Sequence, residues 1–144
     1  LTIQKMRYKD KLEYEIEVEE EIYDEEIVKL IVQPIVENGI YHGIKFKDSK
    51  CLLQIIGYSS GNDIIIKVID NGVGMSEEVL SHIFDEHKVN YKSNGIGVYN
   101  VQMRLKLHYG KNYGITYESK LGKGTTATIT IPKRKVQEGN NEKV

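Results

Sequence analysis

The chain has 144 residues, of which 40% are hydrophobic and 28% are charged, and its formal net charge is -1. A chain of this length forms one domain that buries roughly 68–70% of its unfolded surface. Its balanced charge excludes the basic surface that nucleic-acid binding needs. We therefore expect a globular domain without a DNA or RNA partner.

A single cysteine, Cys51, makes an intramolecular disulfide impossible and favours a reducing compartment. Cys51 lies in an apolar run, so we expect it to be a small residue of the core. No apolar run approaches the roughly 20 residues that span a bilayer, and no signal-peptide pattern opens the chain. The sequence predicts a soluble chain, and its start at Leu1 instead of methionine suggests a fragment of something longer.

The first predicted element is a strand over residues 12–19, where apolar residues alternate with glutamates. The glutamates give this strand an acidic outer face, and such a charge run is more typical of a solvated face than of a metal site. An apolar run over residues 27–32 then leads to Pro34, which suits the first turn of a helix but not its interior. The sequence therefore predicts a break before Pro34 and a second helical segment that Gly43 ends.

Two apolar runs, residues 52–58 and 64–69, are separated by the turn-rich residues 59–63, which favours an antiparallel hairpin. The second strand delivers Asp70 into a glycine turn that extends to Met75. A carboxylate there can accept the hydrogens of an amino group, and the glycines let the backbone approach a ligand closely. A plain turn, in which Asp70 bonds its own backbone, is the alternative.

Ser76 is suited to cap a short helix that we expect to extend through Phe84, since two glutamates follow in its first turn. Residues 85–94 are polar and without period, so they predict a mobile loop. A further helix is expected from Gly95 to Gly110. Its apolar stripe would consist of Val98, Val101, Met103, Leu105 and Leu107.

Alternation over residues 115–118 and 126–131 predicts a closing hairpin through residues 120–124. Residues 133–144 are polar and lack periodicity, so we expect a disordered tail after a domain of residues 1–132. Strands grouped with two or three helices, without strict βαβ alternation, predict an α+β fold with helices on one face of a mixed sheet.

Four polar or glycine-rich segments need a common explanation: residues 37–38, 70–74, 95–97 and 122–125. A purine nucleotide lying across the sheet fits them. Asp70 would take the exocyclic amine, and the backbone amides at the start of the helix at Gly95 would face the phosphates.

These segments resemble the N box and the three glycine boxes of the ATP-binding catalytic domain of bacterial sensor histidine kinases. That domain belongs to a superfamily that also includes gyrase, Hsp90 and MutL. The matching stretches are residues 32–43, 70–75, 94–98 and 122–125, and the resemblance covers about residues 7–132. It implies a Bergerat fold, which is a two-layer α/β sandwich with a mixed, mostly antiparallel sheet and a mobile ATP lid before Gly95.

The resemblance also implies the ligands, ATP and Mg²⁺, and their contacts. Asn38 would hold Mg²⁺, to which an amide oxygen is suited, and Asp70 would contact the adenine amino group. The remaining nucleotide contacts implied are Gly72, Gly74, Met75, Gly95, Gly97, Val98, Thr125 and His42. Three of these residues have a purely structural role as the alternative. Asn38 would be a solvated helix residue, Thr125 an edge-strand threonine, and His42 the end of its helix.

The N box departs from the family pattern at two positions. Pro34 stands where many relatives have an asparagine or glutamate, and Tyr41 stands where a lysine is often found. The carboxylate is instead the adjacent Glu37, which helix geometry turns about 100° away from Asn38. We expect Glu37 to act as an acid/base or supporting residue, with an exposed structural role as the alternative.

Phosphoryl transfer asks a protein mostly for positioning and charge neutralisation. The resemblance implies a histidine kinase that transfers the γ-phosphoryl group of ATP to a histidine on dimerisation helices absent from this chain. It further implies a homodimeric, membrane-anchored bacterial parent protein, a cytoplasmic catalytic domain without membrane contact of its own, and a response regulator as partner. The alternatives are a nucleotide-switched interaction module and an ATP hydrolase clamp. The clamp needs a carboxylate where Pro34 stands.

Overall fold

The computed structural model describes residues 2–8, 12–19, 26–40, 50–85 and 95–133. Six strands form one sheet in the order β1-β2-β3-β4-β6-β5. The strands are β1 (Thr2–Tyr8), β2 (Leu12–Val18), β3 (Cys51–Ser60), β4 (Asp63–Asp70), β5 (Gly114–Lys120) and β6 (Gly124–Pro132). Only the β2–β3 pair of this sheet is parallel.

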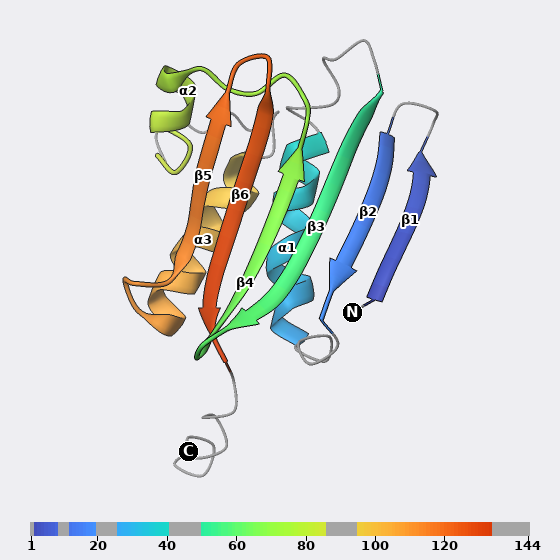
Figure 1. Ribbon diagram of the computed structural model, residues 1–144. Helices are drawn as coiled ribbons and strands as arrows, with labels where there is room; N and C mark the ends of the chain where they lie inside the picture. The colour runs from blue at the N-terminus through green and yellow to red at the C-terminus, as the bar shows by residue number, and fades with distance from the viewer. Residues whose placement is uncertain (1, 9–11, 20–25, 41–49, 86–94, 134–144) are drawn as a thin grey trace, which may run out of the picture.

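Two long helices, α1 (Glu26–Gly39) and α3 (Gly95–Tyr109), cover one face of the sheet (Figure 1). The short α2 (Glu77–Ser81) lies beside the end of β5. Because α1 connects β2 to β3, the chain can cross over and place these two strands parallel. The arrangement confirms the predicted α+β fold with a mixed sheet and its helices on one face.

Helix α1 runs without interruption through Pro34, so the predicted break before this residue was wrong. Ile31 and Ile35 lie one helical turn apart, before and after Pro34, and both are buried. Burying both against the sheet requires a continuous helix, and this gain outweighs the backbone hydrogen bond that proline cannot make. The predicted stop at Gly43 lies outside the described residues.

The β3–β4 hairpin is tighter than predicted, because Ser60 pairs with Asp63 and leaves only Gly61 and Asn62 in the loop. Gly61 has a φ of 62°, the left-handed conformation that two-residue hairpin loops favour. Along β4 the side chains alternate between buried and half-buried, which places the final residue, Asp70, on the same face as the buried apolar ones. Strand β1 was missed, since its alternation is too weak to identify.

Helix α2 is shorter than predicted and ends at Ser81, not at Phe84. Ser76 caps it as expected, because its Oγ accepts the Val79 N–H at 3.2 Å. After Ser81 the backbone continues with tight bonds between residues three apart, such as Ile83 N–H to Leu80 C=O at 3.2 Å, and these do not continue an α-helix.

The stripe predicted for α3 was partly wrong. Met103 is 41% exposed and Leu107 is 83% exposed. The buried face carries Gln102 instead, whose amide accepts the Ile115 N–H at 2.8 Å and donates to the Ile115 C=O at 3.1 Å. A glutamine is suited to this position because it satisfies the edge of β5 while docking the helix on the sheet.

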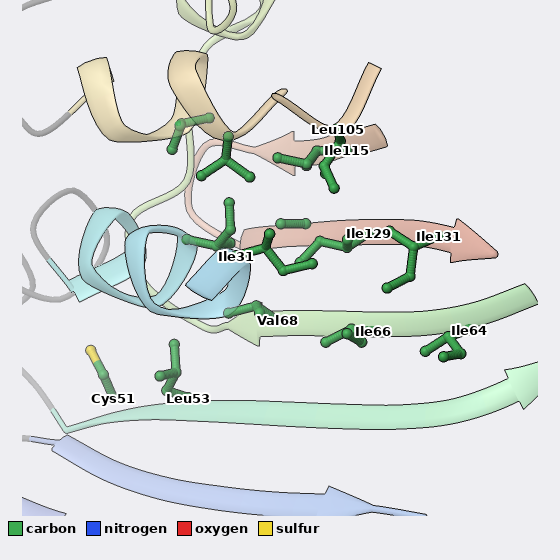
Figure 2. Packing of buried hydrophobic residues seen from close by; sticks show 14 of the residues in the cluster. Ile31, Cys51, Leu53, Ile64, Ile66, Val68, Leu105, Ile115, Ile129 and Ile131 are labelled. Atoms are coloured by element: carbon green, nitrogen blue, oxygen red, sulfur yellow. The ribbon is translucent and has the colours of Figure 1, made fainter. Parts of the chain in front are cut away.

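The core lies between the sheet and the helix layer, where Figure 2 shows Ile31 of α1 among side chains from β4 and β6. Cys51 is buried at one end of this cluster, as predicted for a small core residue (Figure 2). After the last strand, the Lys133 N–H donates a hydrogen bond to the Asn62 C=O, so the first residue of the predicted tail is bound to the β3–β4 hairpin. Residues 134–144 lie outside the described residues. No helix in the described part of the chain is long and apolar enough to cross a membrane.

Candidate functional site

A pocket opens between α1 and the adjoining ends of β4, β5 and β6. It is lined by Ile35, Asn38, Gly39, Val68, Asp70, Gly74, Met75, Tyr117, Thr125 and Ala127. Five of these, Asn38, Asp70, Gly74, Met75 and Thr125, were predicted as site residues, and they come from three of the four sequence boxes. The free space among the side chains measures about 20 Å³, which is room for one water molecule.

Asp70 is 5% exposed and ends β4 at the floor of the pocket. Its Oδ1 accepts the Gly72 N–H at 2.8 Å, so the turn predicted as the alternative does form. The carboxylate nevertheless lines the pocket, and a Cβ at Gly39 would lie only 3.5 Å from Oδ2. The turn therefore holds the carboxylate in place beside α1. The next side chain, Asn71, accepts the Leu52 N–H at 2.8 Å and ties the turn to β3.

The first and third glycine boxes pack directly against each other. Gly74 has a φ of 75°, and a Cβ there would collide with the carbonyl oxygen of Lys120. Gly124 has a φ of 124°, and a Cβ there would collide with the carbonyl oxygen of Asp70. Both positions therefore require glycine for backbone packing, whether or not a ligand is near.

Ser119, which was not predicted, connects three parts of the pocket wall. Its Oγ accepts the Met75 N–H at 2.8 Å, donates to the Gly124 C=O at 3.0 Å and lies 2.7 Å from the Thr125 hydroxyl. A hydroxyl has one proton. Because that proton is directed at Gly124, the Thr125 hydroxyl donates to Ser119 and keeps acceptor lone pairs for the pocket.

Tyr117 of β5 was also missed, although strand alternation places it on the same face as the buried Ile115. Its hydroxyl is buried and is the only such side-chain polar atom in the described part of the chain without a hydrogen-bond partner. Burial raises the pKa of this hydroxyl far above its usual range. The nearby Asn38 side chain lowers this pKa in part, although its distance and angles to the hydroxyl do not meet those of a hydrogen bond. The negative charge of the Asp70 carboxylate raises the pKa further. The ring packs against Phe84, with centroids 5.7 Å apart.

The two predicted residues of the N box face different surroundings. Asn38 is 5% exposed and lines the pocket next to Asp70. Glu37 is exposed, does not line the pocket, and accepts a hydrogen bond from Gln33 Nε2 at 3.1 Å, one helical turn earlier. Its acid/base role stays a prediction, and this placement agrees with the exposed structural alternative. His42 lies outside the described residues.

The second glycine box begins α3 but does not line the pocket. Gly95 is the first residue of the helix. A Cβ at Gly97 would lie 3.4 Å from the Cβ of Pro34, so Gly97 lets α3 approach α1 closely. The Val98 side chain is fully buried in the core, and only its backbone is suited to a ligand contact. The predicted lid is also outside the described residues, except for Asp85.

Comparison with known proteins agrees with this geometry. The model of the family described as histidine kinase-, DNA gyrase B-, and HSP90-like ATPase matches residues 23–135. Sensor histidine kinase YesM of Bacillus subtilis strain 168 is 31% identical over 134 residues, which is 93% of this chain and 22% of that protein. Sensor protein LytS of Oceanobacillus iheyensis is 32% identical over 136 residues, covering 93% of this chain and 23% of that protein.

Solved structures agree on the fold. The catalytic domain of histidine kinase ThkA, in a nucleotide-free form, gives a TM-score of 0.64 at 18% identity, over 85% of this chain and 78% of that one. A blue-light activated histidine kinase of Erythrobacter litoralis gives 0.61 at 16% identity, over 88% and 37%. The chain spans less than a quarter of the curated relatives named above. As the four boxes predicted, the chain belongs to the family of histidine kinase-, DNA gyrase B- and HSP90-like ATPases.

Proposed function

We propose that this chain is the ATP-binding catalytic domain of a sensor histidine kinase, which presents ATP for phosphoryl transfer to a histidine on helices outside this sequence. The observation that carries the proposal is the meeting of Asn38, Asp70 and Thr125 in one pocket from three distant parts of the chain. The relatives at 31% and 32% identity are named as sensor kinases or sensor proteins, which supports the same activity here.

The base end of the site is formed by Asp70 and Thr125, which stand opposite each other on β4 and β6. Both offer acceptors, so an exocyclic amino group is the partner they suit. Met75 also lines the pocket, and its unbranched, flexible side chain can adapt to the shape of a base. Gly72 and Gly74 would contribute backbone beside the base.

The phosphate end would be held from Asn38 and from the start of α3 at Gly95. The described residues contain no group of three or more His, Cys, Asp or Glu side chains that could hold a metal ion. A magnesium site formed by one amide oxygen, phosphate oxygens and water needs no such group, and Mg²⁺ binds nucleotides in this manner. We propose further phosphate contacts from His42 and the backbone of Gly97 and Val98, and an acid/base or supporting role for Glu37.

Bound ATP supplies the phosphoryl group, while the residues of this chain orient it and neutralise its charge. The acceptor histidine would come from dimerisation helices of the same kinase, and a response regulator would receive the phosphoryl group afterwards. A membrane-anchored, homodimeric parent protein follows from the same proposal. A carboxylate one turn before Asn38, as in an ATP hydrolase clamp, is replaced by Pro34, and the transfer reaction is therefore favoured over hydrolysis.

The proposal is tested first by titrating the chain with ATP and Mg²⁺. Asp70→Asn should weaken ATP binding about 10- to 150-fold, since a hydrogen bond to a charged group is worth roughly 1.5–3 kcal/mol. Asp63→Asn is the matched control, because Asp63 begins the same strand and its carboxylate accepts the Tyr113 hydroxyl instead. Equal affinities for both variants and the parent chain would refute the adenine site.

Phosphotransfer is tested by adding the dimerisation helices of a YesM-type kinase in trans. Labelled phosphate should appear on those helices and not on His82 or His108 of this chain. ATP binding without transfer to any helix partner would favour the nucleotide-switched interaction module, and steady release of inorganic phosphate would favour the hydrolase clamp.

A further inference from the structure

The Tyr117 hydroxyl presents an unsatisfied hydrogen-bond donor inside the pocket. It is buried, it has no partner in the described part of the chain, and its residue lines the same hollow as Asp70 and Thr125. A buried hydroxyl without a partner is destabilising, so a partner supplied by a ligand would restore the missing hydrogen bond.

The sheet register places this donor next to the base-binding acceptors. Ser119, Thr125 and Asp70 form one row across β5, β6 and β4. Tyr117 and Ala127 begin the adjacent row on the same face, two residues away and therefore roughly 7 Å along the strands. The small Ala127 leaves space beside the phenol, and the Asp70 carboxylate is close enough to influence the pKa of its hydroxyl.

Three donors around Asp70 and Thr125 are already used within the protein. The Gly72 N–H bonds to Asp70, the Met75 N–H bonds to Ser119, and the Thr125 proton is directed at Ser119. The base end thus offers acceptors from Asp70 and Thr125 and a donor from Tyr117.

This pattern is complementary to one edge of adenine, where an amino group that donates lies next to a ring nitrogen, N1, that accepts. We infer that Tyr117 is a specificity-determining residue whose hydroxyl donates a hydrogen bond to adenine N1 while Asp70 and Thr125 receive the amino group. Guanine carries a carbonyl oxygen and an N–H at the corresponding positions, so the same three side chains reject it. The inference rests on the proposed ATP site.

A tyrosine hydroxyl with the ordinary pKa of about 10 is already protonated at neutral pH, and burial raises the pKa of Tyr117 further, so its hydroxyl is a donor throughout the neutral range. Tyr113 is a suitable contrast. It lies nearby in sequence, but its hydroxyl bonds to Asp63 at 3.2 Å and does not line the pocket.

The test compares the parent chain, Tyr117→Phe and Tyr113→Phe in binding ATP, 7-deaza-ATP and 1-deaza-ATP. Tyr117→Phe should weaken the binding of ATP and 7-deaza-ATP about two- to twelvefold, the range of one neutral hydrogen bond. It should not weaken 1-deaza-ATP, which lacks the acceptor. Tyr113→Phe should bind all three nucleotides like the parent chain.

Thermal unfolding without nucleotide provides a second readout. Replacing the phenol by a phenyl ring removes no hydrogen bond within the protein, so the variant Tyr117→Phe should melt at the same temperature as the parent chain or higher. Unchanged ATP affinity in Tyr117→Phe, or an equal loss for 1-deaza-ATP and ATP, would overturn the inference. Failure of the site itself would look different, because the parent chain would then bind none of the nucleotides.

Discussion

The hydroxyl oxygens of Ser119 and Thr125 lie 2.7 Å apart on the neighbouring strands β5 and β6, in the wall of the candidate base site. Ser119 uses its own proton on Gly124 and accepts from Met75. One small side chain therefore fixes both the orientation of the Thr125 hydroxyl and the backbone that carries Met75.

Ser119→Ala removes these three interactions together. The free energy of unfolding should fall by about 1–3 kcal/mol, and ATP affinity should fall with it because Thr125 and Met75 lose their anchor. Urea unfolding and nucleotide titration measure the two effects. Thr116→Ala, an exposed position on the opposite face of β5, should change stability by less than about 0.5 kcal/mol. Equal effects of the two substitutions would contradict this role for Ser119.

Gly74→Ala should be far more costly than Gly61→Ala. Both glycines have positive φ, so each substitution adds backbone strain of roughly 1–2 kcal/mol. Only at Gly74 would the new Cβ also collide with the Lys120 carbonyl, whereas the space around Gly61 is open. Denaturant midpoints of the two variants give the comparison. If they were alike, the tight contact between Gly74 and the Lys120 backbone would not exist.

Gly97→Ala separates a packing role from a nucleotide role. A methyl group at Gly97 would meet Pro34 at 3.4 Å, which is a tight but tolerable contact. Alanine also favours the helix by about 0.8–1.0 kcal/mol relative to glycine. The variant should therefore fold with at least the parent stability by circular dichroism. A loss of ATP affinity in this stable variant would indicate that the backbone at Gly97 contacts the phosphates.

The raised pKa of Tyr117 predicts a pH dependence of stability. An unfolded tyrosine loses its proton near pH 10, whereas burial keeps the folded Tyr117 hydroxyl protonated to higher pH. The unfolded chain therefore gains stability on deprotonation, and the folded state is progressively destabilised above about pH 10. Tyr117→Phe lacks this contribution. Its stability relative to the parent chain should rise by roughly 1.4 kcal/mol per pH unit above that point. Parallel unfolding curves between about pH 9 and about pH 11 would contradict the buried position.

Periodicity identified the elements that bury one regular face. The β3–β4 and β5–β6 hairpins and the buried positions Val98, Val101 and Leu105 of α3 were all confirmed. The errors arose where tertiary contacts outweighed local preference. Pro34 stays within α1 because the helix must bury Ile31 and Ile35, and Gln102 replaces apolar side chains on α3 because the edge of β5 needs hydrogen bonds.

The site was predictable where a motif marks it and not where strand register builds it. Asn38, Asp70, Gly74, Met75 and Thr125 were predicted and line one pocket. Ser119 and Tyr117 carry no motif. Tyr117 lines the pocket, and Ser119 holds Met75 and Thr125 in its wall, because β5 pairs with β6 in a particular register. One sequence alone does not fix that pairing.

The contact of Gly74 with Lys120 and of Gly124 with Asp70 makes two stretches about fifty residues apart a single mechanical part. A replacement that alters the backbone path of one stretch would therefore collide with the backbone of the other. A graft intended to change the base preference of this domain should therefore move residues 70–75 and 119–125 together. Either stretch alone would pack against a backbone to which its own shape is not matched.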